Sequence, residues 1–160
     1  MKNARCCLSG LVHLSAGKVE LLDGKTNMAI YGIGASYSNR DVSPKFIKKG
    51  LACIGWSEKD AQPLYAMLKH FQIGDIVYIK AHPAQVGLII KAIGIVTSDE
   101  LKKDKELGVG IAVKWLWIGE ERLGKFNDKY PVRNITLYRE FSRSIQAKVL
   151  KLLLSRIRPR

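Results

Sequence analysis

A run of β-branched and other aliphatic residues from Val86 to Thr97 constrains the fold more than any other feature of the sequence. Lys91 is the only charged residue in this run. A stretch that is apolar at both odd and even positions is typical of a strand buried on both faces of a sheet. We therefore predict a central strand here, with a neighbouring strand on each edge.

Other segments supply the neighbours. The first of these predicted strands, Ile30–Ser36, contains Gly32 and Gly34, which allow another backbone to approach closely. The predicted strands are Ile30–Ser36, Ile76–Ala81 after a Gly74-Asp75 turn, Val109–Ile118, and a short last strand Ile135–Tyr138. Between them, we predict a charged loop over Ser98–Gly108 and a turn-rich connector over Glu120–Arg133.

Two short helices are expected between the first two of these strands, joined by a turn. Ser43-Pro44 provides an N-cap followed by proline in the first turn, and Gly50 provides a C-terminal stop. The second helix begins between Asp60 and Pro63. Its predicted buried stripe consists of Leu64, Met67, Leu68 and Phe71.

A final helix is predicted over Arg139–Arg156, and it is both amphipathic and basic. Its apolar face consists of Tyr138, Phe141, Ile145, Val149 and Leu152. Its opposite face carries Arg139, Arg143, Lys148, Lys151 and Arg158. Such a helix can pack with a solvated outer face, contact nucleic acid, or lie on a membrane surface. A fourth alternative is an adaptor role, in which its apolar side docks on a partner protein.

Charge favours nucleic acid among these partners. The 160-residue chain has a formal net charge of +13. Residues 122–160 contain eleven Lys or Arg against Asp128 and Glu140, so this quarter of the chain holds +9 of that charge. An uneven basic distribution is the electrostatic signature of a polyanion-binding surface. The membrane alternative is weakest, because aromatic residues are scarce near the apolar end of the helix.

The length favours a single domain over residues 28–160, preceded by an extension over residues 1–27. The extension has a candidate hairpin in which Leu11–Leu14 and Val19–Leu22 flank Ser15–Lys18. The sequence contains no apolar run of about 20 residues that could cross a membrane, and no secretion signal is expected. Three cysteines form no disulfide or zinc pattern, so we expect a cytoplasmic protein without metal or cofactor.

Several short motifs resemble one superfamily. They are Ala35-Ser-Tyr-Ser38 with Asp41, Lys49–Trp56, Gly74–Lys80 and Val113-Lys-Trp115. In their order along the chain they resemble the PUA-like superfamily, and within it EVE and YTH domains and the DNA-recognition domains of methyl-directed restriction GTPases. The resemblance covers residues 29 to about 118. It implies an α+β fold, a mixed PUA-like barrel with flanking helices, which the basic C-terminal helix closes.

The resemblance also implies a mechanism, in which an unpaired or flipped base enters an aromatic-lined pocket. The residues assigned to base binding are Ser36, Tyr37, Ser38, Asp41, Cys53 and Trp56. Ala52 stands where related readers place the first tryptophan, and Trp56 is the candidate to replace it, opposite Tyr37. For Asp41 an alternative is to cap the following helix, and for Cys53 an alternative is the core.

Two groups of cations are assigned to contacts with the phosphate backbone. Such contacts position a nucleic acid without reading its sequence. Those near the pocket mouth are Arg40, Lys45, Lys48 and Lys49, and those of the last helix are Arg139, Arg143, Lys148 and Lys151. Catalytic motifs such as a nucleophile triad or a phosphate loop are absent from the sequence.

We therefore predict a non-catalytic protein that binds DNA or RNA and holds one base, which can carry a modification. Three alternatives remain open at this point: a nucleotide or small-ligand binding protein, an ASCH-like ribonuclease, and an adaptor of a defence system. A polymer binder should lose affinity steeply with salt, whereas a mononucleotide binder should not.

Overall fold

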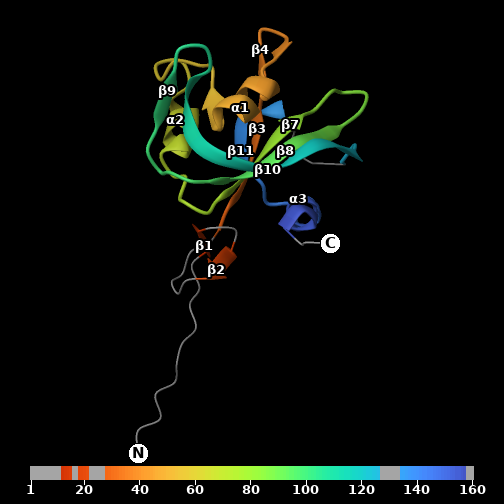
Figure 1. Ribbon diagram of the computed structural model, residues 1–160. Helices are drawn as coiled ribbons and strands as arrows, with labels where there is room; N and C mark the ends of the chain where they lie inside the picture. Colours follow the sequence, from red (N-terminus) through yellow and green to blue (C-terminus); the bar gives the residue numbers. More distant parts are fainter. Residues whose placement is uncertain (1–11, 16–17, 22–27, 127–133, 158–160) are drawn as a thin grey trace, which may run out of the picture.

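The computed structural model describes residues 12–15, 18–21, 28–126 and 134–157. It shows an α+β fold in which a mixed sheet curls into a half-barrel, accompanied by three helices (Figure 1). The sheet order is β11 (Leu137–Arg139), β3 (Ile30–Gly34), β7 (Ile76–Ala81), β8 (Leu88–Val96), β10 (Gly108–Gly124) and β6 (Leu51–Ile54), with β9 (Lys102–Asp104) also paired to β10.

The predicted central strand is confirmed. β8 pairs antiparallel with β7 on one edge and with β10 on the other. Apart from Lys91, all its side chains are buried. On the far side of β7 lies β3, which runs parallel to it, so these two strands end at the same edge of the sheet.

β10 is longer than predicted, since it continues through residues 120–124, where we expected a connector. Its first part, Gly108–Ala112, pairs with β6 and β9, and its remainder pairs with β8. Register shifts beyond Trp115 and beyond Ile118 change the direction of the strand. The composition of residues 120–124 indicates turns, but their pairing with β8 makes them part of the strand.

Helix α1 (Ser43–Lys49) has the predicted proline in its first turn, and Gly50 ends it with a left-handed φ of 63°. The predicted N-cap is wrong. Val42 occupies the cap position, while Ser43 is buried in the first turn and donates its hydroxyl to Asp41. The expected direct turn to the second helix is also wrong, because β6 lies between α1 and α2 (Gln62–Leu68) and pairs with β10.

Two apolar clusters occupy opposite faces of the sheet. One contains Phe46 of α1 and Leu68 of α2, together with Phe71. As predicted, Leu68 and Phe71 are buried, while Leu64 and Met67 are partly buried. The other cluster contains side chains of α3 (Arg143–Ile157), namely Ile145, Val149 and Leu153.

The predicted apolar face of the last helix needs two corrections. Phe141 is 75% exposed, because α3 begins only at Arg143 and Phe141 precedes it. Arg139 likewise belongs to β11 and not to the helix. Tyr138 is buried as expected, but from β11.

Two hairpins stand outside the large sheet. The candidate N-terminal hairpin is confirmed as β1 (Val12–Ser15) paired antiparallel with β2 (Lys18–Leu21). The second hairpin joins β4 (Ser36–Tyr37) to β5 (Arg40–Asp41) and projects from the body of the fold (Figure 1). Its turn residues Ser38 and Asn39 have φ values of 48° and 62°, which is the backbone of a tight hairpin turn.

Candidate nucleic-acid interface

A polar pocket lies where the parallel strands β3 and β7 end. Its volume is about 580 Å³. The hairpin β4–β5, the residues after β7, Lys91 of β8 and the segment before β11 complete its wall. We call it the β3–β7 pocket, and its polar lining consists of Ser36, Asn39, Asp41, Lys80, His82, Lys91, Asn134 and Thr136.

Lys80 is the most unusual group in this pocket. Its side chain belongs to a residue that is only 7% exposed, and burial lowers the pKa of its ammonium group to about 8. The ammonium lies 5.6 Å from the centre of the Tyr138 ring, a distance typical of a cation–π contact. A buried cation with a shifted pKa in a concave site is a recognised marker of function.

A buried hydrogen-bond network holds the Tyr138 ring in place. Its hydroxyl lies 2.5 Å from the Tyr78 hydroxyl, which donates to the Glu140 carboxylate at 2.8 Å. The second oxygen of Glu140 accepts the backbone N–H of Ser142 at 2.8 Å. Burial, reinforced by Tyr138 and Glu140, raises the pKa of Tyr78, so its hydroxyl stays protonated. The network ties β7 to β11 and to the segment that enters α3.

Two polar pairs shape the rim of the pocket. Lys91 donates to Asp41 at 2.6 Å, and Ser43 donates to the same carboxylate through its N–H and its hydroxyl. Partial burial raises the pKa of Asp41, but these hydrogen bonds outweigh that effect and the net pKa is lowered. In the second pair, the His82 ring nitrogen Nδ1 lies 2.8 Å from the Asn134 amide oxygen.

The structure brings together only part of the predicted base-binding set. Ser36 and Asp41 line the β3–β7 pocket, whereas Tyr37, Ser38, Cys53 and Trp56 do not. Cys53 is fully buried in the core, and Ser38 is exposed at the hairpin turn. Lys80 also lines the pocket but was not predicted, although it is the one lysine in the apolar strand Ile76–Ala81.

Tyr37 anchors the hairpin to the barrel. Its hydroxyl donates toward the carbonyls of Leu107 at 2.9 Å and Cys53 at 3.1 Å, and its ring meets Phe46 edge-on at 6.1 Å. Burial raises the pKa of this hydroxyl. Trp56, in contrast, is 57% exposed. Among the described ring contacts Tyr37 meets Phe46 and not Trp56, and neither ring lines the β3–β7 pocket, so the facing pair predicted from the sequence is not formed there.

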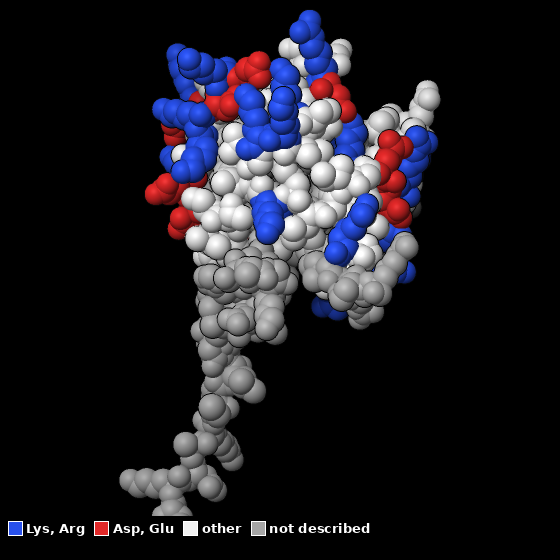
Figure 2. Space-filling model, in the orientation of Figure 1, with Lys and Arg blue, Asp and Glu red and all other residues white. Residues whose placement is uncertain are grey.

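The predicted cations near the pocket differ in their availability. Lys49 pairs with Asp104 at 2.8 Å and with Glu106 at 3.2 Å, and Lys45 pairs with Glu106 at 3.4 Å. Within the described ranges, Arg40 and Lys48 are exposed and make no ion pair. Figure 2 shows the basic side chains of this face with acidic side chains among them.

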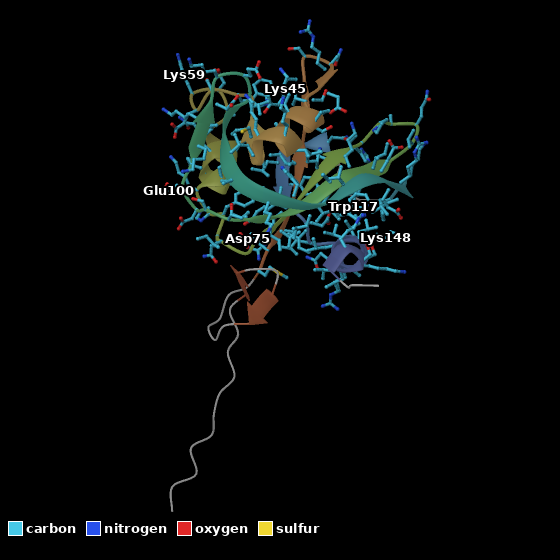
Figure 3. The ribbon with its side chains drawn as sticks, in the orientation of Figure 1. Lys45, Lys59, Asp75, Glu100, Trp117 and Lys148 are labelled. Carbon is cyan, nitrogen blue, oxygen red and sulfur yellow. The ribbon has the colours of Figure 1, made fainter. Side chains whose placement is uncertain are left out.

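The cations of α3 form a separate surface. α1 packs on one face of the sheet and α3 on the other, so Lys45 and Lys148 lie on different sides of the molecule (Figure 3). Lys148 pairs with Glu121 at 2.5 Å, whereas Arg143 and Lys151 are exposed and have no ion pair in the described part of the chain. Arg158 lies outside the described residues. The guanidinium of Arg139 stacks 5.5 Å from the Phe141 ring.

A second pocket of about 580 Å³ lies at the opposite end of β3, beside Tyr31, His70 and Asp75. Its carboxylate has a structural role, because Asp75 accepts the backbone N–H groups of Ala29 and Gln72, both at 2.9 Å. Figure 3 shows Asp75 on the side of the molecule away from Lys45. The β3–β7 pocket contains the buried Lys80 ammonium with its lowered pKa, and for that reason it is the stronger candidate.

Among the described residues, no group of three or more His, Cys, Asp or Glu side chains is arranged to hold a metal ion. No helix in that part of the chain is long and apolar enough to cross a bilayer. Comparison of the sequence with protein-family models and with curated proteins finds no match.

Proposed function

We propose that this protein binds nucleic acid and holds one unpaired base in the β3–β7 pocket, as a relative of the PUA-like base readers. Arg40 and Lys48 contact the phosphates beside the pocket mouth. The polar lining bonds the edge of the base, and Lys80 supplies a positive charge from below. The bound base carries sequence information, whereas the phosphate contacts only position the strand.

The lining of the pocket is the observation that carries this proposal. A volume of about 580 Å³ lies within the range of small-ligand and cofactor sites. Its side chains offer donors and acceptors together: amides at Asn39 and Asn134, a hydroxyl at Ser36, and an ammonium at Lys80. Such a mixture suits the edge of a base, which also presents donors and acceptors side by side.

Hydrogen bonding has more weight in this proposal than stacking. No Phe, Tyr or Trp is present in the described lining of the β3–β7 pocket. Extrusion of a base from a duplex costs a few kcal/mol, which an unpaired strand avoids. We therefore propose single-stranded or locally unpaired DNA or RNA as the preferred partner. Trp56 offers an exposed stacking surface outside the pocket.

A mononucleotide binder is the second candidate. It is favoured by the ion pairs that engage Lys45 and Lys49, because these lysines are less available to a phosphate backbone. The salt dependence of binding separates the two candidates, since only a polymer releases condensed counterions. Cleavage of an RNA probe by the protein would instead favour the ASCH-like ribonuclease alternative.

A pair of substitutions in the hairpin turn tests the pocket. Asn39 lines it, whereas its neighbour Ser38 does not, and both have positive φ. Glycine tolerates this backbone, so Asn39→Gly and Ser38→Gly both preserve the turn. Asn39→Gly should weaken binding of a single-stranded oligonucleotide by about 1 kcal/mol, the usual contribution of one hydrogen bond. Ser38→Gly should bind like the wild-type protein.

Fluorescence anisotropy of labelled oligonucleotides measures both variants, and thermal melting checks that both fold. If the two variants lose affinity equally, the hairpin tip and not the pocket makes the contact. If neither loses affinity although the wild-type protein binds, the bound strand lies elsewhere.

A further inference from the structure

The β3–β7 pocket continues into a second depression on the surface. This flanking site has a volume of about 500 Å³ and lies between the start of α1 and the middle of β10. Asp41 and Lys91 line both cavities, so their ion pair forms the boundary between them. A ligand that extends past this pair from one cavity enters the other.

The two cavities differ in chemistry. Apolar surface dominates the flanking site, from Pro44, Ile47 and Ile118. Ile118 is 51% exposed although it lies in a strand, and Gly119 beside it adds no side chain. The site is thus a shallow apolar surface next to a polar pocket. It suits the flat face of a base, whereas the β3–β7 pocket suits the edge of one.

The charges of the flanking site point to an anionic ligand. Its two carboxylates are already engaged, Asp41 by Lys91 at 2.6 Å and Glu120 by Arg122 at 2.8 Å. Lys48, the remaining charged residue of the lining, makes no ion pair within the described part of the chain. One cation is therefore available beside the apolar surface, where a phosphate linked to a stacked base would lie.

We propose that the flanking site binds the nucleotide next to the one held in the β3–β7 pocket, so that the protein recognises two consecutive nucleotides of a single strand. This inference rests on the proposed function. The neighbouring base stacks on Ile118 and Ile47, and Lys48 contacts its phosphate. Two observations support this proposal: the cavities share Asp41 and Lys91, and one lining is polar whereas the other is mainly apolar.

Competition binding tests this inference with the full chain. The competitors are the four 5′-mononucleotides and the four matching 5′-phosphorylated homodinucleotides, and the displaced probe is a labelled single-stranded oligonucleotide. The best dinucleotide should compete at least about tenfold better than its mononucleotide, in line with the burial of an apolar surface as large as one aliphatic side chain. Ile118→Ser should remove most of this advantage and leave mononucleotide competition unchanged. Ile73→Ser is the matched control, because Ile73 is 60% exposed but lines neither cavity.

The outcomes separate this inference from the proposed function. Equal competition by mononucleotide and dinucleotide, unaltered by Ile118→Ser, would overturn the flanking site and leave the β3–β7 pocket intact. An equal loss in Ile118→Ser and Ile73→Ser would also overturn it, since the effect would then not be local. A wild-type protein that binds no oligonucleotide would overturn the proposed function together with the inference.

Discussion

At the scale of single residues, Lys80 is the group on which the proposed site depends most. It lies at the end of β7, with the Tyr138 ring on one side and the pocket on the other. Because burial is the cause of its lowered pKa, an anionic ligand that enters the pocket stabilises the charged form. Binding of the ligand and binding of a proton at Lys80 are therefore linked.

This linkage predicts a pH dependence of binding. Lys80 is charged below its pKa of about 8 and neutral above it. The affinity for a single-stranded oligonucleotide should therefore fall as the pH rises from about 7 to about 9, by roughly tenfold or more if one charged hydrogen bond is lost. Lys80→Met should bind more weakly at pH 7 and show no such fall. Anisotropy titrations across this range test it, and parallel pH profiles for the two proteins would contradict the assignment.

The sequence identified some of these residues but not their neighbours in space. Ser36 and Asp41 could be found because they belong to a short motif beside a strand end, and both line the pocket. Tyr37 was assigned to base binding but does not line the pocket, since alternation along a strand does not reveal that its hydroxyl reaches Leu107, seventy residues away in the chain. Lys80 was overlooked because a lysine in a strand is usually solvated.

At the scale of elements, β3 and Tyr138 of β11 fit closely together. A Cβ on Gly32 would lie 2.7 Å from the Tyr138 ring, whereas a Cβ on Gly34 would meet its nearest atom, the Thr136 carbonyl oxygen, at 3.6 Å. The ring cannot move away freely, because its hydroxyl is bonded to Tyr78. Of these two glycines in one strand, Gly34 has room for a Cβ atom and Gly32 does not.

We predict that Gly32→Ala destabilises the fold by about 1–3 kcal/mol through overpacking. Gly34→Ala should remain within about 0.5 kcal/mol of the wild-type protein, as is usual for a change without steric conflict. Chemical denaturation followed by circular dichroism measures both. Equal stability of the two variants would show that Tyr138 does not pack on β3 as described.

The cations of the hairpin and α1 should contact both short and long strands, whereas the cations of α3 should contact only long strands. Lys48 lines the flanking site and Arg40 belongs to the β4–β5 hairpin, whereas Arg143 and Lys151 lie on α3, on the other face of the sheet. Arg40→Ala with Lys48→Ala should weaken binding of strands of about 4 and about 16 nucleotides alike, while Arg143→Ala with Lys151→Ala should affect only the longer. Anisotropy at several salt concentrations tests this, and the salt slope should fall by about 1 for each phosphate that the variant protein no longer neutralises. An effect of the α3 variant on the shorter strand would refute the separation.

Secondary structure was predicted best where the pattern was long or marked by turns. β7, β8 and the Gly50 stop of α1 lie where the sequence places them. β6 was missed because four residues after a helix carry little periodicity, and only their pairing with β10 makes them a strand. The start of α3 was placed too early for a similar reason, since Tyr138 and Arg139 pair with β3.

At the scale of the whole molecule, the apolar side of α3 packs on the sheet, and the proposed binding site lies elsewhere, at the end of β3 and β7. The apolar stripe of α3 is covered by the sheet, with Ile145 and Val149 fully buried. A partner protein at this helix would therefore meet its basic face. A net charge of +13 favours polyanions in general, and in the proposed function the β3–β7 pocket discriminates among them.

The measurement that tests this account most directly compares two strands of equal charge. One is a labelled single-stranded oligonucleotide with its bases, and the other is an abasic strand of the same length and label. We predict that the protein binds the base-bearing strand at least about tenfold more tightly, in line with two or more hydrogen bonds to the held base, and that Asn39→Gly reduces this preference. Equal affinity for the two strands would contradict the account, because binding would then depend on phosphate charge alone.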